Sequence, residues 1–256
     1  MELWHAAILG IIEGVTEFLP ISSTGHLLLG AHLLEIAHVE FVKTFEIAIQ
    51  LGAILAVITL YPKRLLMDRA TITRVITGFI PTAVLGLLFY KIIKTYLLGD
   101  VRIVLAALFL GGIFILFFEH FKKTEGTKTI VDLSLSEAAA IGALQAVAFI
   151  PGVSRSVATI FGGLWNGLSR KEAVEFSFFL AVPTMAAATG LDLLKNYELL
   201  LAPENIQSLL MGFVVSFLVA LCAIKFLVRF VSTHRFKVFG YYRIGIALIF
   251  LCFIVL

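Results

Sequence analysis

Long apolar stretches, separated by short polar or charged segments, make up most of this chain. Six of them contain 16 to 19 residues each, close to the roughly 17 to 20 residues that a helix needs to cross a bilayer. The other apolar stretches are shorter or are interrupted by a turn. This pattern predicts an all-α, polytopic membrane protein. The six candidate spans are 42–60, 75–90, 102–118, 174–191, 207–224 and 239–256.

Two regions, 3–37 and 138–166, each hold two apolar segments joined by a turn that contains Pro20 or Pro151. The second segment of each region is too short to cross a hydrocarbon core of about 30 Å. The residue before a proline also avoids the α conformation, so we expect the first helix to end at Leu19. We therefore predict two re-entrant helical hairpins, each entering and leaving the membrane on one side. Irregular backbone at this depth requires surrounding protein or a wet cavity.

The two hairpins begin two halves of the chain that resemble each other weakly but in constant order. Each half then holds one hairpin and three spans, and an odd number of spans makes the second half an inverted copy of the first. We predict a single membrane domain, 1–256, made of a first repeat at 1–121, a cytoplasmic linker at 122–136 and a second, inverted repeat at 137–256. The aligned pairs include Pro20 with Pro151, Ser23 with Ser154, and Gly78 with Gly212.

Basic residues are distributed unevenly across this topology. Of the 20 Lys and Arg residues, 14 fall on one side of the membrane, five fall on the other, and Arg155 lies within it. The positive-inside rule places the richer side, to which Arg243 is assigned, in the cytoplasm and both termini outside. Charged residues make up only 14% of the chain and the net charge is +3, so a nucleic acid partner is not expected.

Two carboxylates stand out in the first hairpin. Glu13 and Glu17 are four residues apart and share one helix face with Gly10 and Gly14. Buried carboxylates in a membrane are costly and repel each other, so they either face water at the helix end or hold a cation or proton. A divalent cation, Mg²⁺ or Ca²⁺, is the expected cofactor, because hard cations prefer carboxylate and phosphate oxygens. The two glycines allow another backbone or a ligand to come close.

The turns themselves suit an anion. Each exposes a helix N-terminus, which attracts negative charge, and Arg155 provides a planar fork for phosphate oxygens. Two alternatives remain: Arg155 pairs structurally with Glu13 or Glu17, and the hydroxyls are helix caps. Glu46 and Gln50 either line the same cavity or form an interhelical hydrogen bond. The candidate substrate-binding residues of the turns are Ser22, Ser23, Thr24, Gly25, Ser154, Ser156 and Thr159.

The motifs EGVTEFLPISSTGH and PGVSRSVAT, with the run FEIAIQLGAIL at 45–55, resemble the signatures of the bacterial undecaprenyl-diphosphate phosphatase family, which is associated with bacitracin resistance. The resemblance implies hydrolysis of undecaprenyl diphosphate to the monophosphate in the bacterial plasma membrane. The released carrier lipid would return to cell-wall (peptidoglycan) synthesis. It also implies a divalent metal and a site that opens outward. The residues it marks are Glu13, Glu17, Ser22, Ser23, Thr24, His26, Ser154 and Arg155.

The nucleophile stays open at this stage. Ser23 with His26 as its base is our preferred hypothesis, because the two lie within one helical turn. A phosphohistidine at His26 and attack by metal-activated water are the alternatives. A transporter that flips the carrier lipid would share the inverted-repeat architecture, and an enzyme with both activities is compatible with the sequence. An oligomer is equally compatible with it.

Overall fold

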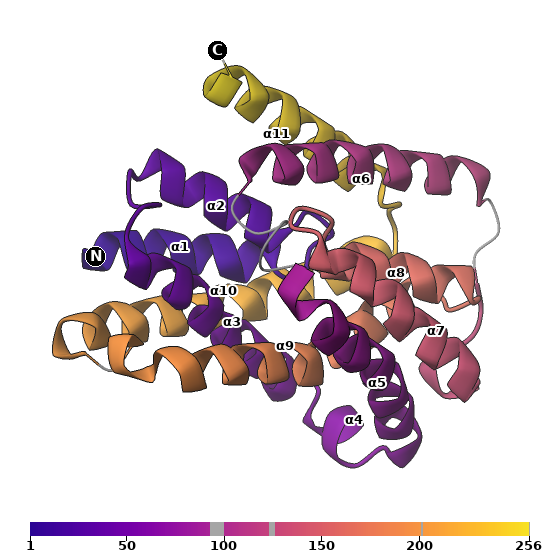
Figure 1. The fold of residues 1–256 in the computed structure, drawn as a ribbon. Helices are drawn as coiled ribbons and strands as arrows, with labels where there is room; N and C mark the ends of the chain where they lie inside the picture. The colour runs from indigo at the N-terminus through magenta and orange to yellow at the C-terminus, as the bar shows by residue number, and fades with distance from the viewer. Residues whose placement is uncertain (93–99, 123–125, 201, 256) are drawn as a thin grey trace.

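The computed structural model is a bundle in which helices from the two halves of the chain interleave (Figure 1). It describes residues 1–92, 100–122, 126–200 and 202–255. Within these ranges the regular secondary structure is helical, apart from an isolated bridge between Lys128 and Leu168. The all-α prediction is therefore confirmed. Residues 123–125 of the predicted linker lie outside the described part of the chain.

All six predicted spans are helical. The sixth, 239–256, forms α11 (Lys237–Val255), and residue 256 lies outside the described residues. The other five form helices that are long and apolar enough to cross a membrane. These are α3 (Glu40–Leu60), α5 (Arg69–Ile92), α6 (Val101–Phe121), α9 (Arg170–Leu200) and α10 (Pro203–Val231).

The two predicted turns reverse the chain between short helices. In the first half α1 (Leu3–Thr16) is followed by α2 (Ser23–Leu33). In the second half α7 (Leu135–Gln145) continues into the 3₁₀ helix η3 (Ala146–Phe149), and α8 (Arg155–Trp165) follows the turn. A further short helix, α4 (Pro62–Leu66), was not predicted.

The first helix ends at Thr16, three residues before the expected end at Leu19. Glu17 follows as the C-cap and still has helical angles, φ −63° and ψ −44°. Its N–H donates to the Glu13 carbonyl at 2.9 Å. The i, i+4 relation between the two carboxylates therefore survives the early end of the helix.

The first helix of each hairpin packs against a span of the other half: α1 lies along α10, and α7 lies along α5. Both contacts depend on glycine. A Cβ atom on Gly14 would lie 2.7 Å from the Ser216 carbonyl oxygen of α10, and one on Gly142 would lie 1.7 Å from the Gly78 carbonyl oxygen of α5. The small-residue face expected on α1 therefore receives another backbone, as small residues do between membrane helices.

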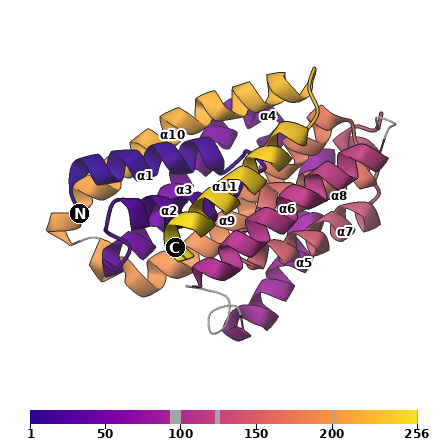
Figure 2. The same ribbon diagram turned by 90° about the horizontal axis from the view of Figure 1, so that it is seen from above.

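The two chain termini lie toward the same end of the bundle in both views (Figures 1 and 2). At the opposite end, α6 finishes and α7 begins. A chain that starts and finishes on one side of a membrane crosses it an even number of times, as the six predicted spans would.

The start of α7 is defined by a capping box. Ser134 Oγ accepts from the Glu137 N–H at 3.2 Å, and a Glu137 carboxylate oxygen accepts from the Ser134 N–H at 2.8 Å. Lys128 Nζ donates to the other oxygen at 2.7 Å. These donors, Lys128 first, lower the pKa of Glu137 to about 2. A carboxylate whose pKa is lower in the folded than in the unfolded protein stabilises the fold at pH values above its unfolded pKa. This stabilisation is lost as the pH falls toward 2, so the capping box persists at neutral pH.

We predict that Gly142→Ala disrupts the contact between α5 and α7. The added methyl group meets the Gly78 backbone, which cannot move aside as a side chain can. The expected loss of unfolding free energy is about 1–3 kcal/mol or more, the usual cost of overpacking. Chemical unfolding in detergent micelles measures it. The matched control is Gly190→Ala, where a Cβ would meet nothing within 4 Å. Equal effects of the two substitutions would contradict this account.

Candidate functional site

The two turns lie against each other and against the first part of α6. Ser156 Oγ donates to the Leu19 carbonyl oxygen at 2.9 Å, which joins the second turn to the first. A Cβ on Gly152 would lie 2.5 Å from the Val104 carbonyl oxygen of α6, and one on Gly25 would lie 3.3 Å from the Val104 side chain. Gly25 is therefore a packing residue of α2. Both turns lie level with the N-terminal part of α6.

Serines begin the second helix of each hairpin. Ser22 and Ser154 are the N-cap residues of α2 and α8, with the rare positive φ values of 74° and 78°. This similarity pairs Ser22 with Ser154 at an offset of 132 residues, rather than Ser23 with Ser154 at 131. Ser154 Oγ accepts from the Val157 N–H at 3.3 Å. The Ser22 side chain forms no capping bond to α2.

Arg243 holds the turns in place. Its side chain is fully buried and donates to the carbonyl oxygens of Gly152 at 2.8 Å and Ala107 at 3.1 Å. Longer bonds reach Leu108 O at 3.3 Å and Pro20 O at 3.5 Å. The arginine side chain has five N–H donors and no acceptor, so it can donate hydrogen bonds to several backbone carbonyl oxygens at once.

The assignment of Arg243 to the cytoplasmic surface was therefore wrong, and the charge count becomes 13 against five. The physical reason is that its hydrogen bonds are all internal, so the charge does not need water. A signal was present in the sequence: an arginine inside the apolar run 239–256. Charged residues within membrane segments commonly bind backbone carbonyls or one another.

Arg155 and Glu17 form the ion pair of the site. Arg155 Nη2 lies 2.9 Å from Glu17 Oε1, and both side chains are largely buried. Arg155 Nη1 donates to the Ser177 carbonyl oxygen at 2.8 Å, and Met185 Sδ lies 3.6 Å from Nη2. The other carboxylate oxygen of Glu17 accepts a short hydrogen bond from the Ser23 hydroxyl. The structure therefore pairs the arginine with Glu17 rather than with Glu13.

Glu13 is fully buried, and neither of its carboxylate oxygens has a hydrogen-bond partner among the described residues. Its counterpart at the offset of 132 is Gln145. The Gln145 amide nitrogen donates to the hydroxyls of Thr82 at 2.9 Å and Thr184 at 3.1 Å. A buried carboxylate without partners is rare in proteins. Its oxygens are therefore available to a ligand.

The ring nitrogens of His26 contact groups other than the Ser23 hydroxyl. Its Nδ1 lies 2.8 Å from the Ser22 carbonyl oxygen, and its Nε2 lies 2.8 Å from the Tyr242 hydroxyl. Because a carbonyl only accepts, Nδ1 carries the proton and the tyrosine donates to Nε2. The His26 ring also stacks on Tyr242, with 5.6 Å between centroids. The group that contacts Ser23 in this arrangement is Glu17, not His26.

A polar cavity of about 150 Å³ lies between the turns. It brings together seven residues that the sequence predicted. Glu13, Gly25, His26, Glu46, Ser156 and Thr159 are not among its lining residues. Thr159 Oγ1 donates to Ser177 Oγ at 2.7 Å, behind Arg155. Glu46 is half-buried on α3. The predicted residues that line the cavity are Glu17, Ser22, Ser23, Thr24, Gln50, Ser154 and Arg155.

Ser177, Met185 and Tyr242 were not predicted as site residues. They lie on α9 and α11, far along the chain from the two motifs. Ser177 follows Phe176, which the repeat aligns with Phe45, but nothing in the local sequence indicates that its carbonyl receives an arginine. Only the packing of α9 on α8 brings it there.

Comparison with known proteins assigns the chain to a family. The model described as "Bacitracin resistance protein BacA" matches residues 6–249. A protein of Aquifex aeolicus named undecaprenyl-diphosphatase is 50% identical over 255 residues, which cover 99% of each chain. Proteins of the same name from Bdellovibrio bacteriovorus and Thermus thermophilus are 47% and 45% identical, covering 98% and 99% of this chain and 95% and 98% of their own. With its five membrane-length helices, this multi-pass membrane protein belongs to the BacA bacitracin resistance family.

Proposed function

We propose that the chain hydrolyses undecaprenyl diphosphate to undecaprenyl phosphate and inorganic phosphate, the substrate that its relatives' names indicate. The observation that supports this most is the polar cavity between the turns, where Arg155, Glu17 and Ser23 meet inside an apolar bundle. A diphosphate on a lipid is a polar group that must be reached at membrane depth. The product would return the carrier lipid to cell-wall synthesis.

The phosphate groups bind where positive charge converges. Arg155 lines the cavity, and the N-termini of α2 and α8 open onto it. The Ser22 side chain leaves the first N–H groups of α2 uncapped, so they remain free for phosphate oxygens. Arg243 adds a second positive charge beneath the turns. Its hydrogen-bond acceptors are neutral backbone carbonyls, which do not cancel that charge.

The Ser23 hydroxyl is the nucleophile that the geometry favours, with Glu17 as its base. Its oxygen attacks the terminal phosphorus while its proton passes to Glu17, which already accepts its hydrogen bond. The bond from that phosphorus to the bridging oxygen breaks, and undecaprenyl phosphate leaves. Water then hydrolyses the phosphoserine and releases inorganic phosphate. Glu17 replaces His26 in this role, because Tyr242 and Ser22 occupy both nitrogens of the imidazole ring.

A divalent cation fits beside this centre. The oxygens of Glu13, which have no hydrogen-bond partner among the described residues, are hard donors one helical turn from Glu17, which lines the cavity, and Mg²⁺ usually binds one or two carboxylates together with substrate phosphates and water. The described residues contain no group of three His, Cys, Asp or Glu side chains suited to a metal, so the substrate would complete the shell. Glu13 and Glu17 would hold the ion, which would neutralise phosphate charge.

The two halves form an inverted repeat of re-entrant hairpins and three spans. The matched caps Ser22 and Ser154 support this, and so do Gly78 and Gly212, each of which meets the first hairpin helix of the other half. The charge count of 13 against five still favours termini outside. The turns lie level with the start of α6, and with the termini outside we infer that the cavity opens to the outer face of the plasma membrane.

We predict that Glu17→Gln lowers turnover by about 10² or more, because it removes the charge that pairs with Arg155 and the base for Ser23. Phosphate release from undecaprenyl diphosphate in detergent micelles measures this without a second membrane side, which excludes transport. Glu40→Gln, at an exposed position at the start of α3 that does not line the cavity, is the matched control and should keep its activity. Full activity of Glu17→Gln would refute the proposed chemistry.

A rapid-quench experiment identifies the nucleophile. With substrate labelled in the terminal phosphate, we expect acid-stable label on Ser23 and none after Ser23→Ala. Acid-labile label on His26 would instead establish a phosphohistidine. Turnover by Ser23→Ala without any covalent label would assign the attack to water.

For the cation, we predict that Glu13→Gln raises the Mg²⁺ concentration needed for half-maximal activity by about tenfold, the usual scale for a lost ligand or its support. Unfolding curves of the variant with and without Mg²⁺ provide a readout that does not need turnover. A variant that responds to Mg²⁺ as the original chain does would make Glu13 structural.

For the topology, we predict that a cysteine at His38 reacts with a membrane-impermeant thiol reagent in intact cells and that one at His234 does not. Both positions are exposed, and the native Cys222 and Cys252 are replaced beforehand. Labelling at position 234 but not at position 38 would reverse the orientation, and labelling at both positions from outside would overturn the predicted topology and the inverted repeat with it.

A further inference from the structure

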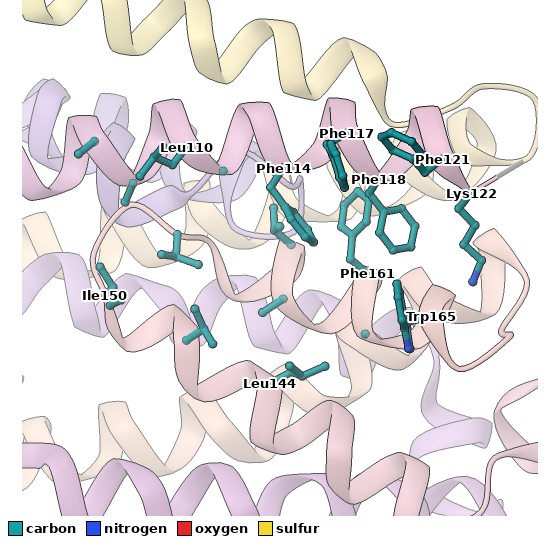
Figure 3. Close-up of a pocket in the computed structure, with 18 of the residues that line it drawn as sticks. Leu110, Phe114, Phe117, Phe118, Phe121, Lys122, Leu144, Ile150, Phe161 and Trp165 are labelled. Carbon is teal, nitrogen blue, oxygen red and sulfur yellow. The ribbon is translucent and has the colours of Figure 1, made fainter.

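A long apolar groove runs between α6 on one side and η3, the second turn and α8 on the other (Figure 3). Its volume is about 1190 Å³, and Lys122 is the one charged residue among the described residues that line it. Ligand pockets for small molecules usually measure about 300–1,000 Å³, so the groove is larger than a soluble diphosphate requires. Phe118 and Phe161 meet edge to face on its wall, with 4.8 Å between their centroids.

The groove and the polar cavity share a wall, the turn at 150–154. Ile150 and Val153 line the groove, whereas Pro151, Gly152 and Ser154 line the polar cavity. Five consecutive residues therefore separate the two spaces. A single molecule with a charged end and an apolar chain could occupy both by passing this turn.

We propose that the groove binds the isoprenoid chain of the substrate while its diphosphate lies in the polar cavity. This inference rests on the proposed function, since it assigns the second part of the same substrate. The groove follows α6 from Ile103 to Phe121, a rise of about 27 Å at 1.5 Å per residue. That length is close to the hydrocarbon thickness of about 30 Å, so the chain can lie along the bilayer normal.

The direction of the chain follows from the ends of the groove. Ile150 lies at one end, and Lys122 and Trp165 lie at the other (Figure 3). The diphosphate end therefore lies at Ile150, and the far end of the chain extends toward Lys122. The acyl chains of phospholipids could fill the same groove. Only binding of the isoprenoid substrate should depend on the diphosphate, and this dependence distinguishes the two lipids.

Photolabelling tests the site without turnover. The probe is a polyprenyl methylene-diphosphonate, which resists hydrolysis, with a diazirine on its chain, added to the full protein in phospholipid nanodiscs. We expect label on α6 and α8, removed by the same compound without the diazirine but not by added phospholipid. Label spread over α5 and α9, or equal displacement by phospholipid, would refute the assignment.

Kinetics of groove variants form the second test. Ala106 and Ala158 line the groove, so Ala106→Trp and Ala158→Phe should raise KM for undecaprenyl diphosphate at least tenfold. Hydrolysis of isopentenyl diphosphate, whose chain is too short to fill the groove, should change less than twofold. Ala187→Trp, at an exposed position of α9 outside the groove, is the matched control and should affect neither substrate.

Equal losses with both substrates, or no loss with either, would refute the groove assignment. If the unaltered chain hydrolyses neither diphosphate, the proposed function fails. Photolabelling then decides the groove by itself, so the two failures can be told apart.

Discussion

The buried guanidinium of Arg243 is the constraint on which the site depends. Two helices are broken in an apolar interior, and each break leaves backbone carbonyls that water cannot reach. Arg243 donates to such a carbonyl in each turn, Pro20 O and Gly152 O, and also to carbonyls within the continuous helix α6. Since unsatisfied polar groups are expensive in lipid, the turns need this donor to hold their shape. The positions of Arg155, Ser23 and Glu17 follow from those turns, although Arg243 does not line the cavity.

The two halves share a backbone plan but differ in their polar groups. In the second half, Gln145 is held by the hydroxyls of Thr82 and Thr184. In the first half, Glu13 takes the equivalent position, and both of its carboxylate oxygens lack a hydrogen-bond partner among the described residues, as does Gln145 Oε1 in the second half. The two hairpins therefore share their helix packing but differ in the polar side chain at this equivalent position. Gln145 is anchored through its amide nitrogen, whereas Glu13 is left with both carboxylate oxygens for a ligand.

The sequence predicted the helices well, because membrane spans require long apolar runs. It offered a pair between Arg155 and an acid of the first motif only as an alternative to phosphate binding, and the structure shows that pair with Glu17. It did not predict Ser177, Met185 or Tyr242, because periodicity indicates which face of a helix is buried but not which distant helix covers it. The orientation of His26 follows from Tyr242 on α11. Local spacing alone had favoured Ser23 as its neighbour.

The turn at 150–154, which separates the groove from the polar cavity, also limits which substitutions could make the protein resistant to an inhibitor. A compound that fills only the groove competes with bilayer lipid, whereas one that spans the turn gains from two linked contacts. Resistance by substitution at the turn is narrowly constrained. Gly152 has a φ of 94°, and any side chain there would collide with the Val104 carbonyl oxygen at 2.5 Å. A compound that rests against Gly152 would therefore contact a position that the protein cannot readily change.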